Sequence, residues 1–308
     1  MNRFKLFIEN FLVYGLGGVM GKMIPFFMLP IITRLLPDTY YMGLSDMSNT
    51  ILSFAQAFAV MGMYDAMFRM FFEKEELAYK KEICSSALFF VLVASCIIFC
   101  IMFFMKKEFS IIFFGKEQYE KLIVVTAFGV LFGATNSIVA APTRMQNKRK
   151  VYLFTNVFTP AVSYMAAVFL LLRKEYVFAL PIGHLLAAFF TELIFIMLNW
   201  KWFSFHYVRW ERIKVLLMIG LPLLPNFLIY WVFNSCDRLM ISKILGMEYT
   251  GIYAVGSKFG QISQLIYTAF AGGWQYFAFS TMRDQDQVEL TSRIFEYLGT
   301  LAVAATIV

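Results

Sequence analysis

Long apolar runs alternate with short polar connections along the entire chain. A helix needs about 20 apolar residues to cross the hydrocarbon layer of a bilayer. The short alternating segments typical of a membrane β-barrel are not found in the sequence. The pattern therefore predicts an all-α, polytopic membrane helical bundle. The expected spans are residues 10–33, 45–67, 83–105, 121–142, 151–172, 177–200, 214–237, 250–279 and 294–308.

The composition agrees with this interpretation. Of the 308 residues, 60% are hydrophobic and 15% are charged, and the mean hydropathy is +0.68. Soluble domains are about 45–50% apolar and about 25% charged. The connections are too short to fold as soluble domains, which disfavours an enzyme with a cytosolic catalytic module. The net charge of +7 lies mainly in the connections, where membrane orientation explains it better than nucleic-acid binding.

Lysine and arginine gather in alternate connections. Arg3 and Lys5 precede the first span, and the connections on that side hold more basic residues than those on the other side. Because cytoplasmic loops are enriched in basic residues, this bias predicts a cytoplasmic N-terminus. The connection that contains Lys106 and Lys107 departs from the trend. The first apolar run is longer than the core of a signal peptide, so we interpret it as an uncleaved span.

Two parts of the chain share a weak internal repeat. In each part, two prolines interrupt a predicted span, and an arginine and a tyrosine–glycine step follow. Paired interrupted helices in matching halves are typical of transporters. We therefore expect a two-lobe, exporter-like architecture: a six-span N-terminal lobe at 1–200, a cytoplasmic linker at 201–213 and a partial C-terminal lobe at 214–308. The repeated positions are Pro25, Pro30, Arg34 and Gly43 in the first part, and Pro222, Pro225, Arg238 and Gly251 in the second.

The sequence ends at LAVAATIV, inside an apolar run. A complete membrane protein usually ends with a polar tail in water. We therefore expect the second lobe to be incomplete and the chain to be a truncated form of a longer protein.

Lys22 lies near the middle of the first predicted span. At about 1.5 Å per residue it is about 18 Å from either end, too far for its side chain to reach the membrane surface. An isolated charge at that depth costs at least about 2.5 kcal/mol, so Lys22 must face protein or a hydrated cavity. Two interpretations stay open: Lys22 binds an anionic ligand, or it forms a structural ion pair within the bundle.

Polar side chains recur at helical spacing in several predicted spans. Any one such stripe is explained by hydrogen bonds between helices, worth about 0.6 kcal/mol each. Together they predict a shared hydrated cavity, and Lys258 beside one stripe adds positive potential. The stripes are Ser45, Asn49, Ser53 and Gln56; Thr126, Gly129, Gly133 and Asn136; Asn156, Thr159 and Ser163; Asn226, Tyr230, Asn234 and Asp237; and Ser257, Gln261, Gln264 and Thr268.

Further charged residues lie at or within the predicted spans. Asp65 and Arg69 are four residues apart at the end of the second span, and Asp237 precedes Arg238 at the end of the seventh. Both pairs fit simple interface ion pairs, and the alternative is a gate that opens and closes with the lobes. Glu192 lies inside the sixth span, where a carboxylate can bind a proton or sodium ion for coupling.

Catalytic and metal-binding patterns are missing. The sequence has no phosphate-binding GKS/T loop, no HExxH and no GxSxG, and it contains 2 histidines. The four cysteines lie in or beside apolar runs without the spacing of a metal site. We therefore predict a protein that is not an enzyme and that uses neither a cofactor nor a metal.

Two stretches carry a resemblance to a known family. They are IPFFMLPIITRLLPDTYYMGL at 24–44 and GLPLLPNFLIYWVFNSCDRLMISKILGMEYTGIYAVGSKFGQI at 220–262. The second is more specific, with proline, then DR, LG and GIY, then a basic residue. Both resemble the oligosaccharide flippase, or Wzx-type polysaccharide transporter, family of the multidrug/oligosaccharidyl-lipid/polysaccharide exporter superfamily. The first stretch departs slightly, with YYMGL where the family more often shows a single YG step.

The resemblance implies two helical lobes in the bacterial inner membrane. It also implies transport of an undecaprenyl-diphosphate-linked sugar repeat to the outer leaflet for surface polysaccharide synthesis. The expected partners are this substrate, membrane lipids and the polysaccharide polymerase machinery, and no nucleic acid. Alternatives are a cation-coupled multidrug exporter of the same superfamily and a non-catalytic or truncated envelope-assembly protein.

On this hypothesis the residues fall into three groups. The prolines that permit helix bending are Pro25, Pro222 and Pro225. The coupling or gate residues are Asp65, Arg69, Glu192 and Asp237. The residues expected to bind the substrate are Lys22, Arg34, Asn49, Ser53, Gln56, Asn226, Tyr230, Asn234, Arg238, Lys258 and Gln261.

Overall fold

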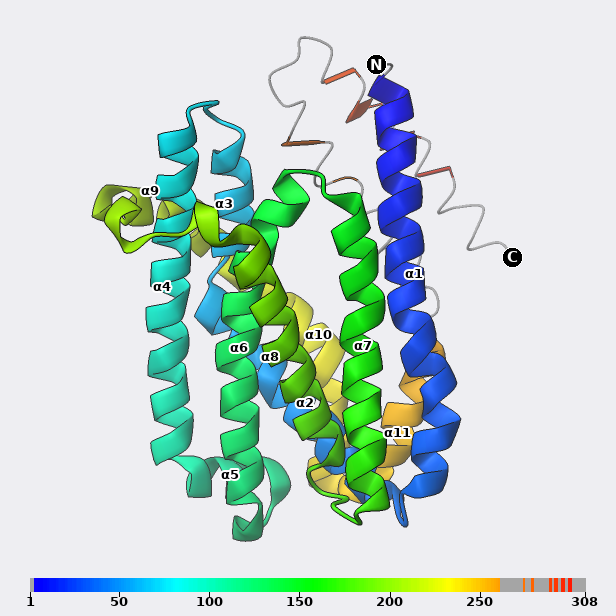
Figure 1. Cartoon of the computed structure of the whole chain (residues 1–308). Coiled ribbons are helices and arrows are strands. Elements are labelled where there is room, and N and C mark those ends of the chain that lie inside the picture. Colours follow the sequence, from blue (N-terminus) through cyan, green and yellow to red (C-terminus); the bar gives the residue numbers. More distant parts are fainter. Residues whose placement is uncertain are drawn as a thin grey trace.

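In the computed structural model the chain forms an elongated bundle of helices (Figure 1). The structure describes residues 3–260, with side chains from residue 17 onward, and the isolated positions 274, 278–279, 288–289, 291–292, 295–296 and 299–300. Every regular element in this part of the chain is an α- or 3₁₀-helix. The predicted all-α fold is therefore confirmed.

The long helices follow the apolar runs. Six of the described helical segments are long and apolar enough to cross a membrane, and α2 with α3 forms a seventh, bent by 46°. These segments confirm the first seven predicted spans. The eighth begins in α11, and the rest of it and the ninth lie outside the described residues. The helices are α1 (Arg3–Leu35), α2 (Thr39–Val60), α3 (Met63–Phe71), α4 (Leu77–Phe104), α5 (Lys106–Phe114), α6 (Glu120–Met145), α7 (Arg149–Leu172), α8 (Ala179–Asn199), α9 (Trp210–Gly220), α10 (Leu224–Ile244) and α11 (Met247–Gly260).

The second span differs from its predicted bounds. It begins earlier, where the Asp38 carboxylate accepts a hydrogen bond from the Tyr40 backbone N–H at 2.8 Å and caps α2. It is also broken, because Met61 and Gly62 adopt left-handed φ angles of 46° and 69°. A Cβ on Gly62 would lie 2.5 Å from the Gly220 carbonyl oxygen, so the break is where this backbone meets the end of α9. The apolar run alone did not reveal this break.

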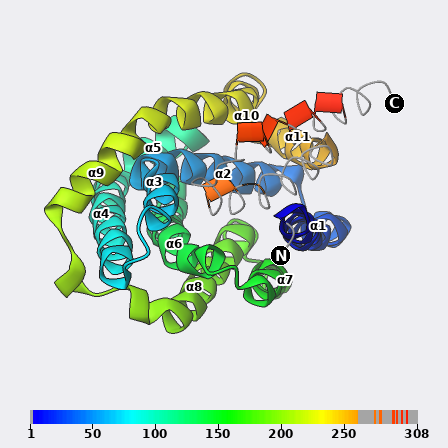
Figure 2. The same ribbon diagram turned by 90° about the horizontal axis from the view of Figure 1, so that it is seen from above.

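The apolar core lies between α2, α3, α4 and α6. Its largest fully buried side chains include Met67 and Phe68 of α3, Ile83 of α4, and Leu122 and Ile138 of α6. Seen from above, α2 lies between α10 on one side and α6 on the other, with α1 and α11 near one end (Figure 2). Both α10 and α11 therefore pack on a helix that belongs to the N-terminal half.

Short α5 explains why one connection departed from the charge trend. Lys106 pairs with Glu120 at 3.2 Å and Lys107 pairs with Glu117 at 2.5 Å. The hydrogen bond from Lys107 to Glu117 raises the pKa of this lysine above its ordinary value. Because acidic partners neutralise two lysines there, that end of the bundle carries less uncompensated positive charge than its lysine count indicates.

Candidate functional site

A polar cavity of about 440 Å³ and a larger one of about 740 Å³ lie on either side of the same stretch of α2. The larger, here called the main cavity, is lined by α1, α2, α6, α7, α8 and α11. It extends from Arg144 and Tyr152, at the turn between α6 and α7, to Pro25 and Lys258 deeper in the bundle. The turn between α6 and α7 lies at the same end of the bundle as the N-terminus (Figure 1).

Three cationic side chains line the main cavity: Lys22 of α1, Arg144 of α6 and Lys258 of α11. The described lining residues include no aspartate or glutamate. Charges interact more strongly in a low-dielectric interior than in water. The cavity therefore favours an anionic ligand.

Arg144 is held in place by two tyrosines. Its Nη1 donates a 2.6 Å hydrogen bond to the Tyr64 hydroxyl, and its guanidinium carbon lies 5.9 Å from the ring centres of both Tyr64 and Tyr152. Sequence reasoning missed this residue, because it belongs to a basic connection that orientation in the membrane already explained. The available signal was its position two residues after the end of the predicted span 121–142, close enough for the helix to continue through it.

Amide and hydroxyl groups line the wall between the cations. Asn156, Thr159 and Ser163 all line the cavity, as expected for the polar stripe of α7. Across the cavity, Asn49 Oδ1 lies 3.2 Å from His184 Nδ1. Two buried atoms, Asn136 Oδ1 and Ser163 Oγ, have no hydrogen-bond partner in the described part of the chain. Such atoms call for water or ligand as a partner, so this wall suits a hydroxyl-rich ligand.

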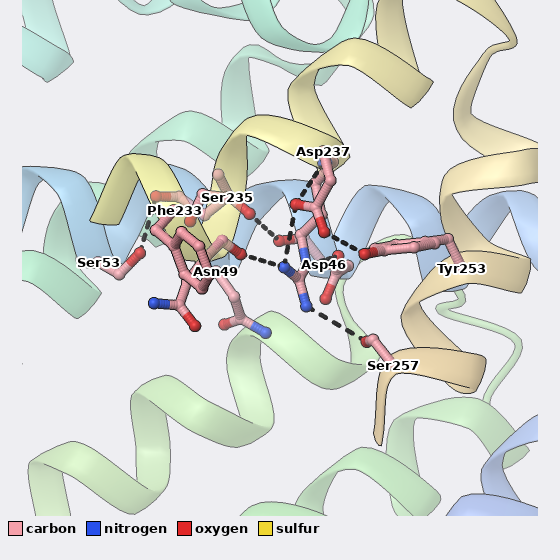
Figure 3. Close-up of a pocket in the computed structure, with 11 residues that line it drawn as sticks. Asp46, Asn49, Ser53, Phe233, Ser235, Asp237, Tyr253 and Ser257 are labelled. Atoms are coloured by element: carbon pink, nitrogen blue, oxygen red, sulfur yellow. Dashed lines mark hydrogen bonds and ion pairs between the residues drawn. The ribbon is translucent and has the colours of Figure 1, made fainter. Parts of the chain in front are cut away.

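The smaller, polar cavity lies between α2, α10 and α11 and is shown in Figure 3. Arg238 is one of its lining residues, and its Nε donates a 2.8 Å charge-assisted hydrogen bond to Asp46 Oδ2. The two side chains are only 13% and 18% exposed. Arg238 also donates to Ser257 Oγ at 3.2 Å, and Tyr253 donates to Asp237. We call this smaller cavity the latch cavity.

Asp46 is the second residue that sequence reasoning missed. The sequence could have revealed it, because Asp46 lies three residues before Asn49 inside a predicted span, where an ionised carboxylate needs a partner. The predicted pair of Asp237 with Arg238 is present, with Asp237 Oδ1 3.5 Å from Arg238 Nη1, but Asp46 is the closer partner at 2.8 Å. Asn49 lines both cavities, and Lys258 of the main cavity follows Ser257 of the latch cavity. The two cavities are therefore neighbours.

Comparison with known proteins identifies the family. The family model described as "Polysaccharide biosynthesis protein" matches residues 31–306. The chain belongs to this family. The predicted resemblance to polysaccharide transporters is thereby confirmed, and the protein is a multi-pass, polysaccharide-related membrane transporter.

A solved structure described as "protein A" supports the fold of this family member. It has a TM-score of 0.69 and 12% sequence identity, and the match covers 98% of this chain and 71% of that chain. At that identity the likeness speaks for the fold alone. No curated protein matches the chain.

Several of the predicted substrate-binding residues do line a cavity in this transporter. Lys22 and Lys258 line the main cavity, Asn49 lines both, and Ser53, Asn234 and Arg238 line the latch cavity. Gln56 instead lines a separate small cavity of about 140 Å³ and donates to the Gly129 carbonyl oxygen at 3.3 Å. It therefore helps to pack α2 against α6, as the alternative interpretation of the stripes expected.

Other predicted residues lie away from both cavities. Arg34, Asn226 and Tyr230 are exposed on the surface of the bundle. Gln261 lies outside the described residues. Of the hinge candidates, Pro25 lines the main cavity, but α1 continues through Pro25 and Pro30, so the predicted interruption of the first span was wrong. Pro222 and Pro225 lie at the 3₁₀ turn Leu221–Leu223 and the start of α10, where the helix is interrupted as predicted.

Of the coupling and gate candidates, some line a cavity and others do not. Asp65 is half-buried and Arg69 is exposed on α3, and neither belongs to the lining of the main cavity or the latch cavity. Glu192 is 8% exposed on α8 beside Thr135 of α6, apart from the lining of the main cavity. Asp237, by contrast, belongs to the charged network of the latch cavity.

Proposed function

We propose that this transporter moves an undecaprenyl-diphosphate-linked oligosaccharide repeat unit across the bacterial inner membrane for surface polysaccharide synthesis. The observation that carries the proposal is the main cavity, with Lys22, Arg144 and Lys258 in its wall and no carboxylate among its described lining residues. A family concerned with polysaccharide biosynthesis supports a sugar-bearing substrate.

The chemistry of such a substrate matches the wall of the cavity. A diphosphate is an anion that would not cross hydrocarbon alone, and lysine and arginine are its usual protein partners. Sugar hydroxyls both donate and accept hydrogen bonds, as do the threonines, serine and asparagines that line the cavity. The cavity volume of about 740 Å³ falls within the range of ligand sites. The prenyl chain stays in the surrounding lipid.

The position of the cavity supports a direction of transport from the cytoplasm outward. It reaches the turn between α6 and α7, which lies at the N-terminal end of the bundle. The distribution of basic residues favours a cytoplasmic location for that end. The substrate therefore enters from the cytoplasmic leaflet and leaves at the opposite end by alternating access.

One observation favours a second candidate, a cation-coupled exporter. Glu192 is a buried carboxylate inside a span, and its Oε2 has no hydrogen-bond partner among the described residues. A carboxylate of this kind is a coupling-ion site in other transporters. In a drug exporter Glu192→Gln would abolish transport while the cavity lysines would matter little, the reverse of what a diphosphate carrier requires.

The test is rescue of surface polysaccharide in a flippase-deficient strain. We expect Lys22→Ala and Lys258→Ala to lose rescue although the protein still inserts in the membrane. Lys243→Ala is the matched control, because Lys243 is exposed at the end of α10. Normal export by a stably inserted Lys22→Ala variant would refute the proposal.

A further inference from the structure

Helices α2 and α11 touch each other backbone to backbone near their first residues. A Cβ on Gly43 would overlap the Met247 carbonyl oxygen, and a Cβ on Gly251 would overlap the Thr39 carbonyl oxygen. On α2, Thr39 lies four residues before Gly43, and on α11, Met247 lies four residues before Gly251. Each glycine therefore meets the residue four positions before the other glycine. The contact is reciprocal, as expected for two repeat-related helices that pack about a local two-fold axis. We call it the glycine crossing.

The glycine crossing lies at the end of the bundle opposite the N-terminus. The helix α1 runs from the N-terminal end to Leu35, and α2 starts at Thr39 on the far side. Figure 1 shows α11 starting at that same side. The main cavity reaches the N-terminal end at Arg144 and Tyr152, so the glycine crossing lies between this cavity and the other side of the membrane.

A charged contact holds α10 against α2 about one helical turn further into the bundle. Asp46 of α2, three residues after Gly43, accepts the 2.8 Å hydrogen bond from Arg238 of α10, and the guanidinium reaches Ser257 of α11 at 3.2 Å. Arg238 of α10 is therefore the one residue of the latch cavity that bonds both α2 and α11 in the described structure.

The latch cavity also lies next to the anion-binding wall. Asn49 lines both cavities, and Lys258 adjoins Ser257 in the chain. A phosphate held at Lys258 would thus approach the guanidinium that Asp46 occupies. Carboxylate and phosphate oxygens compete well for arginine because both match its planar set of donors.

We propose that Asp46 is an internal substitute for the phosphate of the substrate. It holds Arg238 while the site is empty, and a substrate phosphate bound at Lys258 takes over the guanidinium and frees α2 from α10 and α11 at the glycine crossing. Exchange of one anion for another avoids leaving the arginine unpaired, which is the costly alternative for a buried charge. This inference rests on the proposed function, and it assigns Asp46 as a positioning residue and Arg238 as a second phosphate contact.

The first test measures binding of inorganic pyrophosphate to the purified chain in detergent by calorimetry. Asp46→Asn weakens the hold on Arg238, so we expect pyrophosphate affinity to rise by about tenfold, the value of one added charge-assisted hydrogen bond. The double variant Asp46→Asn with Arg238→Gln should lose this gain. Glu82→Gln is the matched control, because Glu82 pairs with Arg212 at 2.9 Å between α4 and α9, away from both cavities.

The outcomes separate the two proposals. If Lys258→Ala binds pyrophosphate as well as the native chain does, the phosphate site of the proposed function is wrong. If Lys258→Ala loses binding but Asp46→Asn gains none, the phosphate site stands and the anion exchange is wrong. An equal gain in Glu82→Gln would also overturn the exchange, because the effect would then be general loosening of the bundle.

The second test follows the opening itself. A single cysteine at Thr159, in the wall of the main cavity, is placed in a chain whose four native cysteines are replaced. We expect pyrophosphate to increase its labelling by a membrane-impermeant maleimide added on the side opposite the N-terminus, and Asp46→Asn to be labelled without pyrophosphate. If neither pyrophosphate nor Asp46→Asn changes the labelling, the proposed exchange of Asp46 for phosphate at Arg238 is wrong.

Discussion

The span that contains α6 and the span that α9 and α10 form together are similarly apolar, yet α6 and α10 are held in the bundle by different forces. The spans Glu117–Met145 and Trp210–Ile244 are similarly apolar, but 56% of the most apolar stretch of the first is buried and only 11% of that of the second, within the described part of the chain. Apolar packing surrounds α6, whereas α10 meets α2 through Arg238 and Trp231. Hydropathy predicts which helices enter the membrane, but not what they contact there.

The largest expected loss of stability comes from breaking the ion pair between Asp46 of α2 and Arg238 of α10. Asp46→Ala leaves Arg238 without its main partner in a place where it is only 13% exposed. Removing one member of a buried ion pair costs about 3–5 kcal/mol. We expect a strong drop in thermal stability in detergent, together with cleavage by protease near Gly246, the turn between α10 and α11.

Glu82→Ala provides the comparison for this prediction. Glu82 and Arg212 are 21% and 31% exposed, so water screens their charges more and the loss should be smaller. If both variants lose the same stability, α10 does not depend on its ion pair in the way proposed here.

The same substitution in the two helices gives the second prediction. Ile138 of α6 is 0% exposed and Ile229 of α10 is 69% exposed. Ile138→Ala opens a void in the core and should cost about 2 kcal/mol or more, while Ile229→Ala should stay within about 0.5 kcal/mol. Unfolding in detergent monitored by tryptophan fluorescence measures both, and equal losses would show that α10 is packed as tightly as α6.

The third prediction concerns the glycine crossing. An added methyl group at Gly43 meets backbone atoms of α11, which cannot move away as a flexible side chain would. Overpacking of this kind costs about 1–3 kcal/mol. Here we expect the strain to separate α2 from α11, so Gly43→Ala should increase labelling of a cysteine at Thr159 from the side opposite the N-terminus.

Gly256→Ala is the control on α11, since a Cβ at Gly256 meets no atom within 4 Å. It should change neither stability nor labelling. A Gly43→Ala protein that is as stable as the Gly256→Ala protein and as poorly labelled would show that the crossing is looser than the structure describes.

The sequence predicted the helices and much of the main cavity, because both depend on short-range patterns. An apolar run of sufficient length must be a helix in lipid, and the step of three or four residues placed Asn156, Thr159 and Ser163 on one face of α7. Lys22 was predictable too, since a charge at that depth needs a hydrated or protein environment.

The latch cavity was not predictable because its decisive contact joins residues far apart in the chain. Arg238 forms its shorter ion pair, of 2.8 Å, with Asp46 across 192 positions, and a longer one of 3.5 Å with adjacent Asp237. Likewise, Arg144 resembles the other basic residues of its connection until Tyr64 orients it. The sequence shows that a buried arginine needs an acidic partner. Only the packing of α10 against α2 determines which carboxylate that partner is.

The smallest expected effect concerns the second polar contact of α10. The indole N–H of Trp231 donates to the Thr50 carbonyl oxygen at 3.2 Å and to Ser53 Oγ at 3.1 Å. Trp231→Phe keeps an aromatic ring against Phe54 but removes this donor, for a loss of about 0.5–1.5 kcal/mol. Tyr230→Phe, one residue away and 58% exposed, should have no measurable effect. Thermal unfolding in detergent compares the two variants. If they are equally stable, the Asp46–Arg238 pair alone attaches α10, and the difference between α10 and α6 becomes sharper still.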